Sequence, residues 1–279
     1  MKTRIIVDST ADLVPEIKAR VYTVPLTVHF GQEEYIDGVT IDHRTFYEKL
    51  VESDVMPTTS QATPDAFIKE FEKARQAGES AVVITLASKF SGTYQSAMIA
   101  AADYENIYVV DGTSAAMGTG ILVELAFRLL DAGMSAEEIA DALEKEKKKI
   151  VVVALVDTLE YLKRGGRISK TAAFAGGVLN IKPVLHVDDA GHLVPVSKTM
   201  GRKKSVQALV KYMEALQTME KDDPIFISHG DCREDVDYLI RLLEEKFPGH
   251  EILVSYIGPV IGTHAGAGTV ALFFRGRHR

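Results

Sequence analysis

The chain has 279 residues, a length that fits one large domain or two of modest size. Hydrophobic residues make up 46% of it and charged residues 25%, which excludes a disordered chain. The 39 acidic residues outnumber the 32 Lys and Arg residues, and the resulting net charge of −7 argues against nucleic-acid binding and against a polybasic membrane anchor.

The cysteine content and the N-terminus favour a cytoplasmic protein. Cys232 is the only cysteine, which excludes a disulfide framework and a zinc site built on thiolates. The apolar run at residues 5–7 is too short for a signal peptide, and no stretch approaches the ~18 apolar residues of a membrane span. The eight histidines are scattered without metal-ligand spacing, so we expect no metal site.

Short β-branched runs alternate with amphipathic stretches in the first half of the chain. Strands are predicted at residues 4–7, 22–28, 81–86, 107–110 and 150–156. Helices are predicted at residues 43–51, 64–77, 93–102, 114–132 and 135–148. Thr63 before Pro64 is a helix-start signal, and Ser135 with Glu138 forms a capping box. Because the predicted strands are apolar on both faces, the alternation predicts a parallel, doubly wound α/β sheet.

The pattern changes after about residue 156. Strands at 181–187 and 193–197 flank a polar turn at 188–191 and predict an antiparallel hairpin. Helices at 201–217 and 233–246 and strands at 224–228, 251–256 and 269–274 follow. We therefore predict two domains, a parallel-sheet α/β domain over residues 1–156 and a mixed-sheet α+β domain over residues 157–279.

Polar residues at two predicted strand ends or loops are candidate site members. Asp8, Ser9 and Thr10 follow the first strand, where ligands of parallel sheets collect, although capping of the next helix explains them equally well. Thr59 lies in a predicted loop of consecutive hydroxyl residues, which can donate hydrogen bonds to an anionic oxygen. Such loops are also common without a ligand.

Ser91 and Gly92 give a stronger signal. They precede a predicted helix that begins at Thr93, and the N–H groups and dipole of a helix N-terminus favour an anion. Ser91 could donate its hydroxyl to that anion, and Gly92 permits a close approach to the backbone. A serine that only caps the helix fits the same residues.

Arg167 and His264 are two further candidates. Arg167 closes a turn that contains a double glycine, a setting that suits recognition of a carboxylate or phosphate. His264 lies in a Gly-rich segment, where it could donate into a cavity lined by small residues, although a lone histidine is usually structural. Together these residues predict an anion site at a domain cleft, without a nucleophile–base pair that would define a reaction.

Six segments taken together resemble the DegV family of bacterial fatty-acid-binding proteins. They are IVDSTADL, PTTSQATPDAF, FSGTYQSA, YLKRGGRIS, NIKPVL and IGPVIGTHAGAG, in this order along nearly the whole chain. The resemblance implies an N-terminal α/β/α domain and a C-terminal mixed-sheet α/β domain. It also implies a tunnel that holds a long-chain fatty acid, with the carboxylate near the inter-domain cleft.

The same resemblance assigns the carboxylate end of that tunnel. The residues implied there are Thr59, Ser91, Gly92, Arg167 and His264. The chain departs from the family pattern at Lys89-Phe90, beside Ser91, which bears on the preference for a particular acyl chain. Family members that act in lipid metabolism present the acid to a separate fatty-acid kinase, so the resemblance implies a carrier with no catalytic residue and no cofactor.

The acyl tail of such a ligand would be stabilised by burial in the tunnel. Burying about 15 methylenes at about 0.8 kcal/mol each contributes roughly 12 kcal/mol before association costs. The helix at 114–132 and the small-residue run at 171–179 are predicted tunnel walls, although apolar stripes equally fit plain core.

Arg202 is a predicted contact with the kinase. Together with Lys203 and Lys204 it begins a predicted helix, where positive charges oppose the helix dipole, although these cations could also be a solvated helix start.

The alternative function is an enzyme, either a serine hydrolase that uses Ser91 or a small-molecule kinase subunit that uses the Gly-rich segment. No motif places a base beside Ser91, and no phosphate-binding lysine follows the glycines. We therefore expect a cytoplasmic, monomeric carrier of a fatty acid that makes at most transient peripheral contact with membranes.

Overall fold

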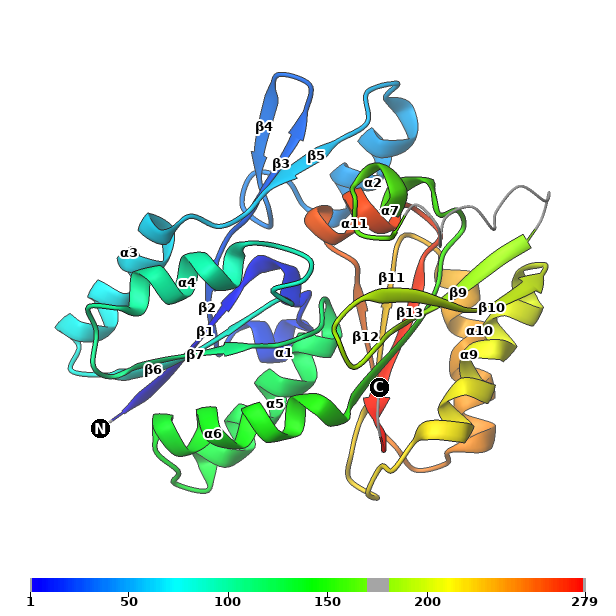
Figure 1. Ribbon diagram of the computed structural model, residues 1–279. Coiled ribbons are helices and arrows are strands. Elements are labelled where there is room, and N and C mark those ends of the chain that lie inside the picture. Colours follow the sequence, from blue (N-terminus) through cyan, green and yellow to red (C-terminus); the bar gives the residue numbers. More distant parts are fainter. Residues whose placement is uncertain (1, 170–180, 278–279) are drawn as a thin grey trace.

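The computed structural model describes residues 2–169 and 181–277, which form three sheets with helices around them (Figure 1). The first sheet has the strand order β2-β1-β6-β7, and all its neighbours pair in parallel. Its strands are β1 (Thr3–Asp8), β2 (Tyr22–Val24), β6 (Ser80–Thr85) and β7 (Ile107–Asp111). The parallel sheet predicted for the N-terminal half is confirmed.

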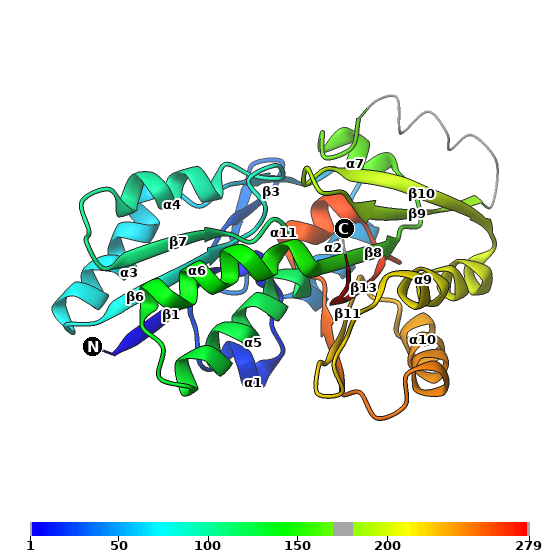
Figure 2. The same cartoon turned by 60° about the horizontal axis from the view of Figure 1, so that its bottom comes forward.

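Helices cover both faces of this sheet, as an α/β/α arrangement requires (Figure 2). They are α3 (Pro64–Gln76) and α4 (Thr93–Ala101) on one face, and α5 (Met117–Asp131) and α6 (Ala136–Glu146) on the other. The predicted start signals are present: the Thr63 hydroxyl accepts a hydrogen bond from the Ala66 N–H, and Ser135 and Glu138 form a capping box. The short helix α1 (Pro15–Lys18) follows β1.

A small antiparallel sheet with the order β4-β3-β5 stands beside the parallel sheet. Its strands are β3 (Thr27–Phe30), β4 (Glu33–Ile36) and β5 (Thr58–Ser60), and α2 (His43–Glu52) packs near it. The prediction of one strand over residues 22–28 was wrong, because Pro25 cannot donate a ladder hydrogen bond and separates β2 from β3. The prediction of a loop around Thr59 was also wrong, since β5 pairs with β3.

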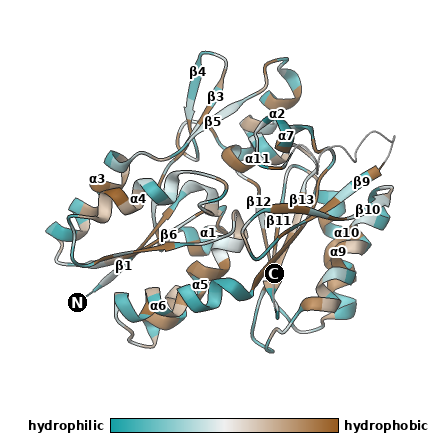
Figure 3. Cartoon of the chain, viewed as in Figure 1, coloured by the Kyte–Doolittle hydropathy of each residue, from teal (hydrophilic) through white to brown (hydrophobic). Residues whose placement is uncertain are grey.

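The third sheet is mixed and has the order β10-β9-β8-β13-β11-β12. Its strands are β8 (Ile150–Leu155), β9 (Ile181–Val187), β10 (Leu193–Met200), β11 (Ile225–His229), β12 (Ile252–Tyr256) and β13 (Val270–Arg275). One face is covered by α9 (Arg202–Leu216) and α10 (Arg233–Lys246), whose buried Leu209 and Leu239 join the core beneath them. Figure 3 shows the apolar colouring on the strands and a mixture of apolar and polar residues on these helices. The mixed sheet of the C-terminal half is confirmed.

Strand β8 belongs to this mixed sheet, where it pairs with β13 and β9. The prediction that grouped residues 150–156 with the parallel sheet was therefore wrong. The strand is buried along its whole length, and its sequence is an unbroken apolar run. Because such a run fits the centre of either sheet, it does not indicate to which sheet the strand belongs. We propose that the domain boundary falls before β8, near residue 149.

Helix α5 lies between the two large sheets. It is buried almost all round, as its sequence predicted, and its core cluster contains Ile5 of β1 as well as Phe273 of β13. The remaining short helices of the described residues are α7 (Glu160–Arg164), α11 (Pro259–Ala265) and the 3-10 helices η1 (Ser9–Ala11) and η2 (Lys147–Lys149). None of the described helices is both long enough and apolar enough to span a membrane.

Candidate functional site

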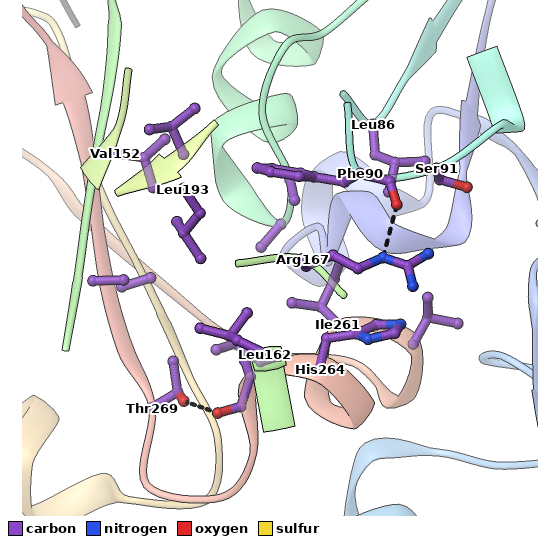
Figure 4. Close-up of a pocket in the computed structure, with 18 of the residues that line it drawn as sticks. Leu86, Phe90, Ser91, Val152, Leu162, Arg167, Leu193, Ile261, His264 and Thr269 are labelled. Atoms are coloured by element: carbon purple, nitrogen blue, oxygen red, sulfur yellow. Dashed lines mark hydrogen bonds between the residues drawn. The ribbon is translucent and has the colours of Figure 1, made fainter. Parts of the chain in front are cut away.

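A cavity of about 230 Å³ lies between the three sheets (Figure 4). Its walls come from β5, the loop after β6, α7, α11 and one face of the mixed sheet. Most of the lining is apolar, and the polar residues of the lining come from segments far apart in the sequence. The cavity therefore depends on how the parts of the chain pack together.

Strand pairing arranges the apolar lining in rows across the mixed sheet. Val152 of β8 is paired with Phe273 of β13, and Ala154 is paired with Ala271 and with Leu185 of β9. Residues two apart on a strand point to the same face and lie ~6.6 Å apart along it. The sheet thus presents one row with two alanines and Leu185 next to a row with Val152 and Phe273.

Thr59 reaches the cavity because β5 is a strand. Side chains alternate along a strand, so Thr59 turns inward while its neighbours Thr58 and Ser60 are exposed. The Thr59 Oγ1 lies 2.8 Å from the Nε2 of His264 on α11. Gly165 makes room for that imidazole, since a Cβ at this position would lie 2.2 Å from the His264 Nδ1.

His264 is a neutral side chain at neutral pH. Burial, aided by the nearby Arg167 charge, lowers the pKa of His264 to about 4. Its Nδ1 is buried and has no hydrogen-bond partner within residues 2–169 and 181–277. The imidazole thus serves as a hydrogen-bonding group of the cavity, not as its positive charge.

Arg167 supplies the positive charge. Its Nε donates to the Phe90 carbonyl at 3.0 Å, and its Nη1 donates to the Gly165 carbonyl. Burial lowers the pKa of Arg167, but a guanidinium stays charged in proteins. Figure 4 shows this guanidinium on the same side of the cavity as Ser91 and His264.

Ser91 contributes a hydroxyl, and Gly92 leaves the space that the Gln61 side chain occupies. The Ser91 Oγ accepts a hydrogen bond from the Thr93 N–H at 3.3 Å and lies 2.9 Å from the Thr93 Oγ1. Thr93 in turn accepts from the Ala62 N–H, so when the Thr93 hydroxyl donates to Ser91, Ser91 keeps its own proton for a ligand. Gly92, the residue that caps α4, faces the Gln61 carboxamide, and a Cβ there would lie 2.2 Å from the Gln61 Oε1.

The structure thus brings together all of the residues predicted for the carboxylate end. They are Thr59, Ser91, Gly92, Arg167 and His264. Gln61, the amide that ends the same polar run as Thr59, also lines the cavity, although it was not assigned to the carboxylate end. The predicted wall at 114–132 is wrong for the helix itself, since only Ala115 and Ala116 before α5 reach the cavity. The predicted wall at 171–179 lies outside the described residues.

Arg202 does not line the cavity, and it is not the free cation that the sequence indicated. Its Nε donates to the Asp235 Oδ2 at 2.8 Å, its Nη2 donates to the Gly268 carbonyl, and its Nη1 lies 3.6 Å from the Asp157 Oδ1. The side chain therefore ties α9 to α10 and to neighbouring loops, a role that no local pattern reveals.

The polar run after β1 also lies away from the cavity. Asp8 accepts hydrogen bonds from the Thr10 and Leu86 N–H groups, and Ser9 donates to the Asp37 Oδ2 at 2.7 Å. These bonds fix loops at the edge of the parallel sheet. Within the described part of the chain, no group of His, Cys, Asp and Glu is arranged to hold a metal ion.

The fold and the cavity define a two-domain α/β protein with a mostly apolar cavity whose polar end carries an arginine, two hydroxyls and a neutral histidine. A model of the DegV family of uncharacterised proteins matches residues 2–277. The chain therefore belongs to the DegV family. It is 40% identical to the DegV domain-containing protein CPE0026 of Clostridium perfringens, over 98% of this chain and 97% of that protein.

Solved structures give the same result. A DegV family protein from Thermus thermophilus, described by its fatty-acid binding, superimposes with a TM-score of 0.91 at 32% identity, covering 99% of this chain and 100% of that one. DegV of Bacillus subtilis, described as a fatty-acid-binding protein, superimposes with a TM-score of 0.87 at 30% identity, covering 99% and 100%.

Proposed function

We propose that the protein binds a long-chain fatty acid in this cavity and presents its carboxylate to a fatty-acid kinase. One observation carries the proposal: a single cavity joins an apolar sheet face to a half-buried arginine with hydroxyl and imidazole groups around it. The fatty-acid binding described for the Thermus thermophilus and Bacillus subtilis relatives supports it.

The polar end has the chemistry that a buried carboxylate needs. A carboxylate taken out of water has to be hydrogen-bonded and balanced by a positive charge. Arg167 provides the charge, and Thr59, Ser91 and His264 provide hydrogen-bonding groups. An aliphatic tail that runs along the mixed sheet contributes about 0.8 kcal/mol for each buried methylene.

The same geometry disfavours an enzyme. Thr59 and His264 are spaced like a nucleophile and its base, but a histidine with a pKa of about 4 is a weak base at neutral pH. The Ser91 hydroxyl is paired with Thr93, which is not a base. We therefore propose a non-catalytic carrier, with phosphorylation performed by the kinase.

A docking role for Arg202 stays a prediction of the sequence. Since its guanidinium is engaged by Asp235 and Asp157, the exposed Lys203 and Lys204 are the cations next to it that a kinase could reach. Variants of these lysines test the docking surface without breaking the Arg202 ion pairs.

The proposed function is tested by comparing ligands that share a tail and differ in the head group. We expect palmitate to bind at least tenfold more tightly than the corresponding alcohol, because only the acid exploits the Arg167 charge. With a bacterial fatty-acid kinase and ATP, the bound acid should be converted to its acyl phosphate. Equal affinity for the acid and the alcohol, or no binding of either, would contradict the proposal.

A further inference from the structure

Thr93 contacts the polar end of the cavity without lining it. It is the first residue of α4 and is completely buried, whereas Ser91 lines the cavity. The Thr93 Oγ1 lies 2.9 Å from the Ser91 Oγ and 3.4 Å from the backbone nitrogen of Ala62, which lies between β5 and α3. Thr93 therefore joins a buried backbone N–H group to a hydroxyl of the cavity.

The direction of the hydrogen bond between the two hydroxyls follows from the surroundings of Thr93. The Ala62 N–H group can only donate, so the Thr93 Oγ1 accepts on that side. Because Thr93 is buried, its own proton has no access to water. Among the described residues, the Ser91 Oγ is the acceptor within hydrogen-bond distance of the Thr93 hydroxyl. Since buried polar groups are almost always hydrogen-bonded, Thr93 donates to Ser91.

This direction decides what the Ser91 hydroxyl can do for a ligand. Its oxygen accepts from the Thr93 hydroxyl and also from the Thr93 N–H at 3.3 Å, and a hydroxyl oxygen has two lone pairs. Both lone pairs are therefore used within the protein, and the Ser91 proton has to be donated away from Thr93. Ser91 is thus held as a donor that cannot also accept from a ligand.

We propose that Thr93 is a positioning residue that fixes Ser91 as a hydrogen-bond donor and thereby makes the cavity select an ionised carboxylate over a neutral amide of the same size. The proposal rests on the proposed fatty-acid binding and adds the residue that determines head-group choice. An ionised carboxylate offers only acceptors, whereas the NH₂ group of an amide needs an acceptor. Without the Thr93 hydroxyl, the Ser91 oxygen regains a lone pair, and its proton is no longer directed.

The experiment measures the affinities for palmitate and for palmitamide, which share the tail, by displacement of a fluorescent fatty acid. We expect Thr93→Val to lower the ratio of the two affinities by about tenfold, close to the contribution of one hydrogen bond to a charged group. Valine keeps the shape of threonine, and a general disturbance of the fold would weaken both ligands alike. Thr93→Ser, which restores the hydroxyl, should keep the ratio of the unaltered protein.

Two controls test whether Thr93 acts through Ser91. In a protein that already carries Ser91→Ala, Thr93→Val should not lower the ratio further, because the hydroxyl that it orients is gone. Thr119→Val is the matched control, since Thr119 is another buried threonine at the start of a helix, and its Oγ1 has no partner among the described residues. Thr119→Val should leave the ratio unchanged.

The outcomes separate this inference from the proposed function. If the unaltered protein prefers palmitate and Thr93→Val keeps the ratio, or Thr93→Ser lowers it as much as valine does, the role of Thr93 is overturned and the proposed function stands. A further tenfold fall in the Ser91→Ala background also overturns it. If Thr93→Val does not fold, Thr93→Ala is judged by the same criteria. If the unaltered protein binds neither ligand, both proposals fail.

Discussion

Replacing Thr59 by valine removes one hydroxyl from the cavity while keeping the shape and the β-branching of the side chain. Two interactions are lost: the hydrogen bond of 2.8 Å to the His264 Nε2 and the proposed bond to the ligand carboxylate. A hydrogen bond to a charged group contributes about 1.5–3 kcal/mol, and each 1.4 kcal/mol changes an affinity by about tenfold. We therefore expect fatty-acid affinity to fall by about ten- to a hundredfold.

The same change also has a stability cost, which can be measured separately. His264 already has a buried Nδ1 without a partner among the described residues, and Thr59→Val leaves its Nε2 unpaired as well. An unsatisfied buried polar group costs about 1–3 kcal/mol, which the free energy of unfolding without ligand reports. Affinity is measured by displacement of a fluorescent fatty acid, at a temperature where both proteins are fully folded.

Ser60→Ala is the matched control. Ser60 is the next residue of β5, points outward and shares a hydrogen bond with His29 at the surface. It should leave the affinity unchanged. An affinity in Thr59→Val within twofold of that of the unaltered protein would refute the assignment of Thr59 to the carboxylate site. An equal loss of affinity in Ser60→Ala would show that the loss comes from a disturbed strand β5 and not from the missing Thr59 hydroxyl.

Two further predictions follow from the close packing of the cavity and from a buried carboxyl outside it. Gly165→Ala places a Cβ 2.2 Å from the His264 Nδ1 at a residue with φ of −69°, so the clash is purely steric. Gly165→Ala should weaken fatty-acid binding about tenfold or more. If Gly165→Ala weakens binding just as much in a protein that already carries His264→Ala, the clash with the His264 ring is not the cause. Burial raises the pKa of Asp37 to about 7, so the folded state holds this proton more tightly than the unfolded state and stability falls as pH rises from about 4 to 7. Asp37→Asn should therefore raise the free energy of unfolding at pH 8 by up to about 4 kcal/mol and have little effect near pH 4, as followed by urea denaturation. The same effect at both pH values would contradict the buried, protonated carboxyl.

The sequence predicted most of the helices because their signals are local. Thr63 and Ser135 cap the helices that they were expected to cap, and the apolar α5 is buried. The sheet assignment of β8 could not be predicted, since it depends on pairing with β13, more than a hundred residues later in the chain. The short strand β5 was hidden because three hydroxyl residues in a row show no alternation of apolar and polar side chains.

The cavity, too, could be predicted from the sequence only in part. The residue types at its polar end could be recognised in the sequence, because hydroxyl groups, an arginine in a Gly-rich turn and a histidine are the groups that bind an anion. The pairing of Thr59 with His264 could not be predicted, since it joins residues 205 positions apart. The ion pair of Arg202 with Asp235 and the hydrogen bond of Arg167 to the Phe90 carbonyl could not be predicted either, since they join residues 33 and 77 positions apart.

Mass spectrometry of the lipids released when the purified protein is denatured tests the central claim most directly. The protein should be produced in bacteria, washed free of loosely bound lipid and compared with Arg167→Ala, which removes the cation of the cavity. We predict that the unaltered protein releases a fatty acid of fourteen to eighteen carbons in near-stoichiometric amount and that the variant releases far less. Release of nucleotides only, of no fatty acid even after incubation with fatty acids, or of equal amounts from both proteins would contradict a fatty-acid carrier that uses this cavity.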